Sequence, residues 1–280
     1  MTALAPKRPR GRPRKNPADA EPGTVQALDR GLQLLSVLSK EHRVSLSALA
    51  QTAGMPASTV HRLLTTLQRH RFAEFDEAAQ EWMIGVEAFR VGAGFTKRIN
   101  LVEASRDIMQ RLMHKTGETA NLAIADDGEV VFISQMETHQ PIRAFFRLGT
   151  RSAMHASGAG KVLLAQLSDD ALNTLVRRKG LPRFTPKTLT RFEDLAADLA
   201  ACRTRGWSFD DEERYAGMCC IAAPVFNARG AAVAGISVSG PTVRFGAAAL
   251  PALSAAVCQA AAELSENIGA AADEILGPMV

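Results

Sequence analysis

Small residues precede a predicted helix in the stretch HASGAGKVLL, which begins at His155. Three of them allow backbone N–H groups to converge at the start of that helix: Ser157, Gly158 and Ala159. The first amides of a helix lack intrahelical partners and attract anions, so a carboxylate fits this position. A nucleotide-binding P-loop does not fit, because His155 stands at its first glycine and Val162 at the residue that would hold magnesium. A tight turn without a ligand is the alternative that this stretch leaves open.

Two strand-like runs, MCCIAAPVF and GISVSGP, carry further candidate residues. Ser237 and Ser239 are two apart, so both hydroxyls lie on one face of a strand. If that face is buried, they need partners, and a polar ligand could supply them. The adjacent Cys219 and Cys220 point to opposite faces, so we expect one in the core and the other at a cavity. The four acids 210–213 just before them are typical of a solvated turn.

The N-terminal half carries the pattern of a winged helix–turn–helix. Apolar residues at helical spacing predict a first helix with Thr24 as its N-cap. Ser45 then caps a short helix that Gly54 ends, and Pro56 opens a second one. Two short helices about a glycine turn are a helix–turn–helix, and the alternating runs RFAEFD and EWMIG predict the hairpin of the wing. The run VEAFRVGAGFTKRI predicts a linker helix.

The second helix of this motif is the candidate DNA-reading element. No acidic residue occurs from Pro56 to Arg69, as a helix that faces phosphates requires. Arg62 could reach a guanine edge or a phosphate, and hydroxyls at the helix start could contact phosphates or base edges. The polar face comprises Ser58, Thr59, His61, Arg62, Thr65 and Arg69. An ordinary amphipathic helix with a solvated face is the alternative.

The net charge of +4 lies entirely in residues 1–23, where six Lys/Arg oppose Asp19 and Glu21. Pro, Gly and charge dominate this segment, so we expect it to be disordered alone. Its core Arg10-Gly11-Arg12-Pro13, followed by Arg14, resembles an AT-hook, which suits the narrow minor groove of A·T tracts. A nonspecific basic tail is the alternative.

Beyond position 101 the pattern predicts an antiparallel α+β domain with a sheet on one side and helices on the other. We expect strands at 119–125, 129–137, 141–147, 219–226 and 231–239. Helices are expected over 101–115, from 158, from 169, over 192–205 and over 247–268. The predicted organisation is a basic tail 1–23, a DNA-binding domain 24–85, a linker helix 86–100, an effector-binding and oligomerisation domain 101–270, and a C-terminal tail 271–280.

Several classes of protein are disfavoured by what the sequence lacks. The four cysteines form no CxxC and no zinc-ligand spacing with histidine, so no metal or other cofactor is expected. No apolar signal region begins the chain and no apolar run reaches ~18 residues, so we expect a cytoplasmic protein with reduced thiols and no membrane segment. No general base can be paired with a nucleophile, so we expect no enzyme activity.

Ordered matches along residues 24–268 resemble the IclR family of bacterial transcriptional regulators. The motifs that carry the resemblance include VQALDRGLQLL, GMPASTVHRLL, LGTRSAMHASGAGKVLLA, GWSFDDEE, GMCCIAAPVF and GISVSGP. The resemblance implies a winged helix–turn–helix homodimer on promoter DNA, a linker helix, and a profilin/GAF-like effector domain that often forms a dimer of dimers. The protein would associate with the nucleoid when bound to DNA.

Within the family, the effector-domain motifs are most similar to a glyoxylate-responsive branch. That resemblance implies that the amides of 157–159 hold the carboxylate and that Asp210 accepts a hydrogen bond from the hydrated aldehyde. It also places Cys220, Ser237, Val238 and Ser239 at the ligand. Cys219 stands where a polar residue is expected in relatives, which leaves open which thiol lines the pocket.

The sequence therefore predicts a regulator of a small-acid catabolic operon whose promoter binding changes with glyoxylate. Another small 2-oxo acid or an aromatic acid is an alternative effector. A thiol-based sensor using Cys219 and Cys220 is a different class, although nearby acids would raise the thiol pKa and reactive thiols need a lowered one. An enzyme that turns over a carbonyl compound on the same fold is a third.

Overall fold

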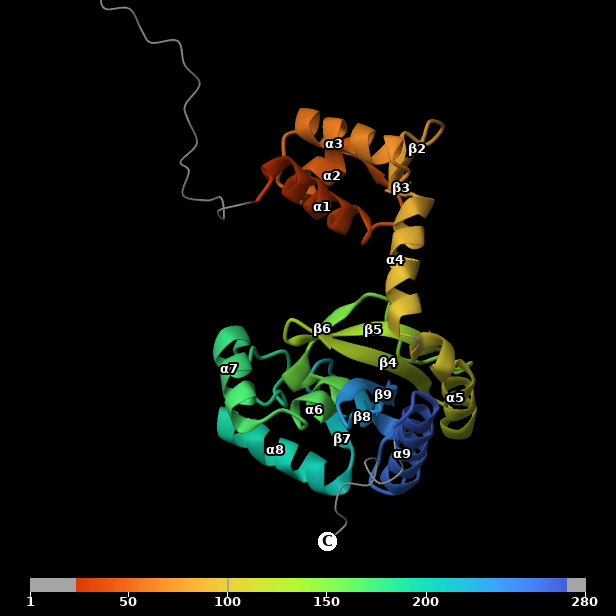
Figure 1. The fold of residues 1–280 in the computed structure, drawn as a ribbon, viewed down its shortest axis with the longest axis vertical. Helices are drawn as coiled ribbons and strands as arrows, with labels where there is room; N and C mark the ends of the chain where they lie inside the picture. Colours follow the sequence, from red (N-terminus) through yellow and green to blue (C-terminus); the bar gives the residue numbers. More distant parts are fainter. Residues whose placement is uncertain (1–23, 100, 271–280) are drawn as a thin grey trace, which may run out of the picture. The chain divides into compact units, whose positions relative to one another are not determined.

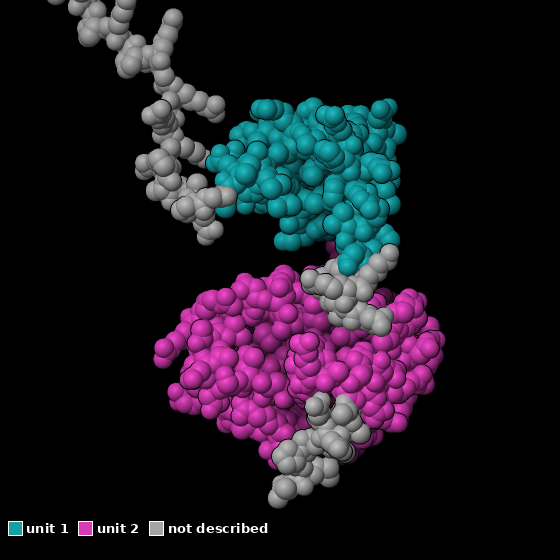
Figure 2. Space-filling view, viewed as in Figure 1, with its two compact units in different colours: residues 1–97 teal, residues 98–280 magenta. Residues whose placement is uncertain are grey.

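The computed structural model describes residues 24–99 and 101–270. The chain divides into two compact units, Met1–Lys97 and Arg98–Val280 (Figure 2). The predicted basic tail with Arg10, Arg12 and Arg14 and the predicted C-terminal tail lie outside the described residues.

The first unit is a winged helix–turn–helix, which confirms the prediction (Figure 1). Its elements are α1 (Gln26–Leu38), β1 (Val44–Ser45), α2 (Leu46–Thr52), α3 (Ala57–Arg69), β2 (Ala73–Asp76), β3 (Glu81–Ile84) and α4 (Val86–Ile99). The short strand β1 adds to the predicted hairpin, so the sheet order is β1-β3-β2. Helix α4 runs uninterrupted through Gly92 and Gly94.

Local chemistry explains the turn of the motif. The Ser45 Oγ accepts a hydrogen bond from the Ala48 N–H at 3.3 Å and so caps α2. Gly54 follows that helix with φ +62, a left-handed conformation that glycine adopts without strain. The prediction for Thr24 is wrong, because the N-cap of α1 is Val25 and no side chain caps that end. Buried leucines and Trp82 then pack the three helices against the wing; each fully buried leucine is worth about 1.5–3 kcal/mol.

The second unit is built on a six-stranded antiparallel sheet of order β6-β5-β4-β9-β8-β7. Its strands are β4 (Thr119–Asp126), β5 (Glu129–Met136), β6 (Arg151–Ala153), β7 (Ser208–Asp211), β8 (Met218–Phe226) and β9 (Ala232–Pro241). Its helices are α5 (Leu101–Thr116), α6 (Gly158–Leu164), α7 (Asp169–Lys179), α8 (Phe192–Arg205) and α9 (Leu250–Asn267), with short 3₁₀ turns η2 (Met154–Ala156) and η3 (Thr242–Arg244).

Helices cover both faces of this sheet rather than the one face predicted (Figure 1). One core cluster joins α5 and α9 to one face of β4, β8 and β9. A second cluster joins α6, α7 and α8 to the other face. Successive residues of β9 point to opposite faces of the sheet: Val238 packs in the first cluster, while the neighbouring Ser237 faces α6. Both faces of the sheet are therefore buried, and the α6 face carries the polar residues.

Two strand predictions are wrong. Residues 141–147 form no strand, and the third strand is β6, which begins at Arg151. In that segment Phe146 stacks on Phe132 with ring centroids 4.5 Å apart, but the segment joins no sheet. The edge strand β7 was not predicted, because its two aspartates are depleted in strands.

Candidate functional site

A small pocket, here called pocket A, lies between the start of α6 and strands β7, β8 and β9. It brings together seven of the eight predicted effector residues: Ser157, Gly158, Ala159, Asp210, Cys220, Ser237 and Ser239. The stacked Phe132 and Phe146 form an apolar wall, and the rest of the lining comprises Ser152, Ala156, Arg214, Tyr215, Met218 and Cys219. The pocket offers about 30 Å³ to the centres of water molecules, which corresponds to about two waters.

The serines of β9 supply hydroxyls on the pocket face of the sheet, as predicted from their spacing. Ser237 is 0% exposed and its Oγ has no hydrogen-bond partner among the described residues. The Ser239 Oγ accepts a hydrogen bond from Asn121 Nδ2 at 3.3 Å. Val238 between them points into the opposite core, so its side chain does not line the pocket. A buried hydroxyl without a partner costs about 1–3 kcal/mol, and a polar ligand would remove that cost.

The two cysteines differ in the way that strand geometry requires. Cys219 is 1% exposed and belongs to the core cluster under α9. Cys220 faces α6, and a Cβ on Gly158 would come within 2.7 Å of its Sγ, so only glycine fits there. Burial, together with the nearby Asp210, raises the pKa of Cys220 to about 11. Burial also raises the pKa of Cys219. Both thiols therefore stay protonated near neutral pH, and a reactive thiolate is disfavoured.

Asp210 lies on β7 opposite Cys220 and is 8% exposed. Its Oδ1 accepts a hydrogen bond from the Glu213 N–H at 2.8 Å. Burial, and to a lesser degree the charge of Glu213, raise the pKa of Asp210 to about 7. The expectation that acids 210–213 form a solvated turn is therefore wrong at both ends, because Asp210 and Glu213 are buried. A carboxyl group that titrates near neutral pH can accept or donate a hydrogen bond to a ligand.

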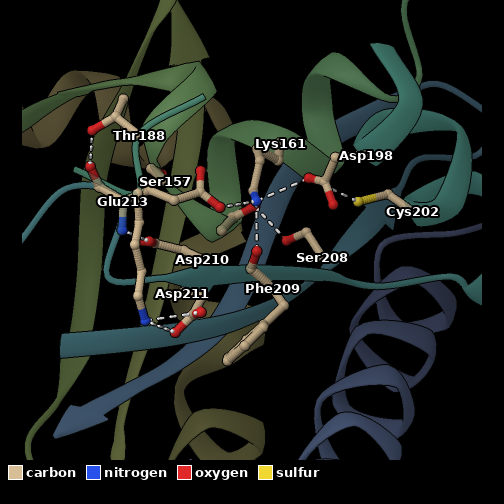
Figure 3. A network of polar contacts seen from close by, with 12 residues as sticks. Ser157, Lys161, Thr188, Asp198, Cys202, Ser208, Phe209, Asp210, Asp211 and Glu213 are labelled. Atoms are coloured by element: carbon tan, nitrogen blue, oxygen red, sulfur yellow. Dashed lines mark hydrogen bonds and ion pairs between the residues drawn. The ribbon is translucent and has the colours of Figure 1, made fainter. Parts of the chain in front are cut away.

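Lys161 is a site residue that sequence reasoning missed. It lies on α6, is 0% exposed, and its ammonium contacts three oxygens (Figure 3). Lys161 Nζ lies 2.5 Å from Glu213 Oε1 and 2.9 Å from Asp198 Oδ2, and it donates to the Phe209 carbonyl at 2.5 Å. Burial alone would lower the pKa of Lys161, but the two carboxylates outweigh it and the pKa is raised. The lysine thus holds the chain on both sides of Asp210, at the Phe209 carbonyl on β7 and at the Glu213 carboxylate after it. The only signal in the sequence is a lysine inside the otherwise apolar run GAGKVLLA.

The structure places the candidate DNA-reading residues on the accessible side of α3. Val60 and Leu64 are buried in the core of the first unit. Thr59 is half-buried, and the other five residues of the polar set are exposed: Ser58, His61, Arg62, Thr65 and Arg69. Thr65 donates its hydroxyl to the His61 carbonyl at 2.9 Å. The helix therefore presents a basic and acid-free face.

The described residues contain no group of three or more His, Cys, Asp or Glu that could hold a metal ion. None of their helices is both long enough and apolar enough to cross a membrane.

Known families and proteins match this chain along most of its length. Residues 27–77 match the family model described as IclR helix-turn-helix domain, and residues 93–266 match Bacterial transcriptional regulator IclR C-terminal. The HTH-type transcriptional regulator BhcR of Paracoccus denitrificans is 49% identical over 261 residues, covering 92% of this chain and 94% of that protein. The HTH-type transcriptional repressor AllR of Escherichia coli is 39% identical over 238 residues, covering 85% and 88%. The crystal structure of Thermotoga maritima IclR, at 27% identity, has a TM-score of 0.73 over 86% of this chain and 98% of that one.

Proposed function

Because the chain belongs to the IclR family of bacterial transcriptional regulators, we propose that it controls a small-acid catabolic operon in response to glyoxylate. The chain is a ligand-responsive, DNA-binding regulator. The observation that supports a small polar effector is pocket A, where the buried Ser237 hydroxyl has no partner among the described residues.

The size of pocket A favours a small acid such as glyoxylate over an aromatic acid. Room for about two water molecules suits an acid of two or three carbons and not the six-membered ring of an aromatic acid. In the proposed complex the amides of 157–159 hold the carboxylate. Asp210 accepts a hydrogen bond from the hydrated aldehyde, and Ser237, Ser239 and Cys220 surround the remaining oxygens. Val238 contributes its main chain.

Calorimetric titration of the full chain with glyoxylate, pyruvate, glycolate and oxalate tests this function. We expect glyoxylate to bind with micromolar affinity and Ser237→Ala to weaken it about two- to tenfold, the worth of one neutral hydrogen bond. Because Ser237 Oγ has no partner among the described residues, the same variant should not lose thermal stability.

Ser265→Ala is the matched control for that experiment. The Ser265 hydroxyl accepts from the Phe226 N–H at 2.9 Å and donates to the Ala261 carbonyl at 2.7 Å, away from pocket A. It should lower stability and leave glyoxylate affinity unchanged. If none of the four acids binds with micromolar affinity, the effector assignment is refuted.

The proposed response follows from differential binding. Glyoxylate would bind one arrangement of the effector domains better than another, and so change the spacing of two DNA-reading helices. We propose a homodimer that associates further into a dimer of dimers and reads a pseudo-palindrome with half-sites set by the helical repeat. Large apolar side chains on the first unit support self-association, since they are more than half exposed in the single chain: Val25, Leu28, Leu32, Val86, Phe89 and Val91.

Arg62→Ala is expected to weaken operator binding about ten- to hundredfold, because a guanidinium that pairs with a guanine or a phosphate contributes about 1–3 kcal/mol. Fluorescence anisotropy with a labelled operator, at a stated salt concentration, measures the change. Arg106→Ala is the control, since Arg106 is an exposed arginine on α5 of the second unit. Equal effects of the two substitutions would argue against α3 as the reading helix.

The basic tail enters the proposal as a second DNA contact. Its Arg10, Arg12 and Arg14 flank the Gly and Pro of the AT-hook-like sequence. Arginines of this kind suit the minor groove beside a helix that reads the major groove.

A further inference from the structure

A second and larger hollow, here called pocket B, lies in the effector-binding unit between β6, the end of α7 and the segment that follows it. It offers about 370 Å³ to water centres, against about 30 Å³ in pocket A. Apolar side chains form about half of its walls: Met154, Leu164, Leu175, Val176, Leu181 and Phe184. A hollow of this size with apolar walls is suited to a small organic molecule.

Arg214 lines both pockets and is therefore the wall between them. Its guanidinium carbon lies 3.8 Å from the centroid of the Phe184 ring, on the pocket B side. Within the described residues, the buried Nε of Arg214 has no hydrogen-bond partner, and the guanidinium makes no ion pair. A guanidinium stacked on an aromatic ring keeps its edge free to bind an anion.

The other cations at pocket B are already neutralised. Arg151 pairs with Asp126 and Glu129 at 2.8 Å each. Lys179 pairs with Asp127 at 2.8 Å. Among the cations that line pocket B, Arg214 is therefore the one that pairs with no carboxylate of the described residues.

His155 does not compete with Arg214 as a cation. Its Nε2 lies 3.0 Å from the Pro182 carbonyl, which can only accept, so the Nε2 carries the proton of that bond. Burial lowers the pKa of His155, and the imidazole is neutral near neutral pH. The histidine therefore holds the Pro182 segment, which forms one side of pocket B.

We propose that pocket B is a second ligand site, distinct from the glyoxylate pocket, that binds a monocarboxylate with an aromatic or other apolar body. The carboxylate pairs with the edge of the Arg214 guanidinium, and the apolar body packs among Leu175, Leu181 and Phe184. One unpaired cation among apolar walls matches a single negative charge better than a doubly charged phosphate.

The test uses benzoate as the probe and the full chain as the protein. In calorimetry, benzoate should bind with and without saturating glyoxylate, since the two ligands occupy different pockets. Arg214→Gln should weaken benzoate about ten- to hundredfold, the effect of removing a charged hydrogen-bond donor. Benzamide, which has the same shape without the charge, should bind as weakly to the unaltered protein as benzoate binds to that variant.

Two further variants locate the site. Leu175→Trp fills pocket B and should abolish benzoate binding without changing glyoxylate affinity. Arg183→Gln is the matched control, because Arg183 lies in the same segment but donates to Pro186 and Thr190 outside the pocket; it should leave benzoate binding unchanged. Thermal unfolding of each variant establishes that it is folded.

Three results would overturn the proposal: no benzoate binding at millimolar concentration, equal benzoate affinity in Arg214→Gln and the unaltered protein, or displacement of benzoate by glyoxylate. The titration without glyoxylate keeps the two proposals separable. If glyoxylate fails to bind, the effector assignment fails, while the Arg214→Gln and Leu175→Trp results still decide pocket B.

Discussion

Replacing Lys161 with methionine is expected to lower the free energy of unfolding of the effector-binding unit by about 3–5 kcal/mol. Removing one partner of a buried ion pair has this effect because the other charge stays buried without compensation. Here the substitution leaves Glu213, which is 5% exposed, without its cation, while Asp198 keeps Arg205 at 3.7 Å. The Glu213 Oε2 has no partner among the described residues, and Lys161 is the cation that the other carboxylate oxygen contacts.

Urea unfolding followed by Trp207 fluorescence measures this loss, in a Trp82→Phe background that removes the other tryptophan. Lys187→Met is a closely matched control. Lys187 also pairs with two carboxylates, those of Asp211 and Glu212, but its side chain is 49% exposed. Solvent screens such a pair, so its loss should change stability far less.

The double variant Lys161→Met/Glu213→Gln separates charge from packing. It should be more stable than Lys161→Met alone, because the second substitution removes the buried charge. If Lys161→Met costs no more than Lys187→Met, the buried pair does not stabilise the unit. A loss in Lys161→Met that Glu213→Gln does not reduce would assign the effect to packing instead.

Glyoxylate affinity is expected to fall about tenfold between pH 8 and pH 6. Burial raises the pKa of Asp210 to about 7, so the carboxyl is mostly ionised at pH 8 and mostly protonated at pH 6. In the proposed complex Asp210 accepts a hydrogen bond from the hydrated aldehyde, and only the ionised carboxylate forms the stronger, charge-assisted bond. Binding at low pH must therefore first remove a proton from Asp210.

Calorimetry across this range, in buffers of different ionisation enthalpy, measures both the affinity and the proton release. Among its neighbours, Cys220 titrates outside the window, with a pKa of about 11, and Lys161 has a raised pKa and stays charged. Burial raises the pKa of Glu213, and Lys161 at 2.5 Å opposes that shift. Asp210→Asn should therefore give a flat pH profile. An equally steep profile in that variant would show that another group titrates.

The raised pKa of Asp210 also makes the stability of the folded protein depend on pH. A carboxyl whose pKa is higher in the folded than in the unfolded state favours folding when protonated, so this contribution is present at low pH. It is lost as the pH rises from about 3.8 towards about 7. Asp210→Asn should accordingly be more stable than the unaltered protein at pH 8, and this gain should shrink at pH 5. A smaller gain at pH 8 than at pH 5 would contradict the assigned direction.

Much of the fold followed from local patterns. The 3.6-residue spacing of Val60 and Leu64 defined which side of α3 is buried, and so which side can face DNA. Ser45 and Gly54 marked the limits of α2, since capping and a left-handed turn depend on residues adjacent in sequence. In the second unit the two-residue spacing of Ser237 and Ser239 placed both hydroxyls on one face. The resemblance of HASGAG to the effector site of IclR regulators connected that face to the start of α6.

What the sequence determined by itself is therefore the periodicity of each element, the face that each residue occupies, and the position of all the net charge in the first 23 residues. Only the tertiary structure decided which faces meet. Lys161 and Glu213 lie 52 positions apart, and no local pattern predicts that they pair. The missing partner of Ser237, the position of Arg214 between two pockets and the size of pocket A likewise depend on elements brought together across the sheet. The reason is physical: alternation along a strand is encoded by neighbouring residues, whereas burial, pKa shifts and cavities arise from atoms that are distant in sequence.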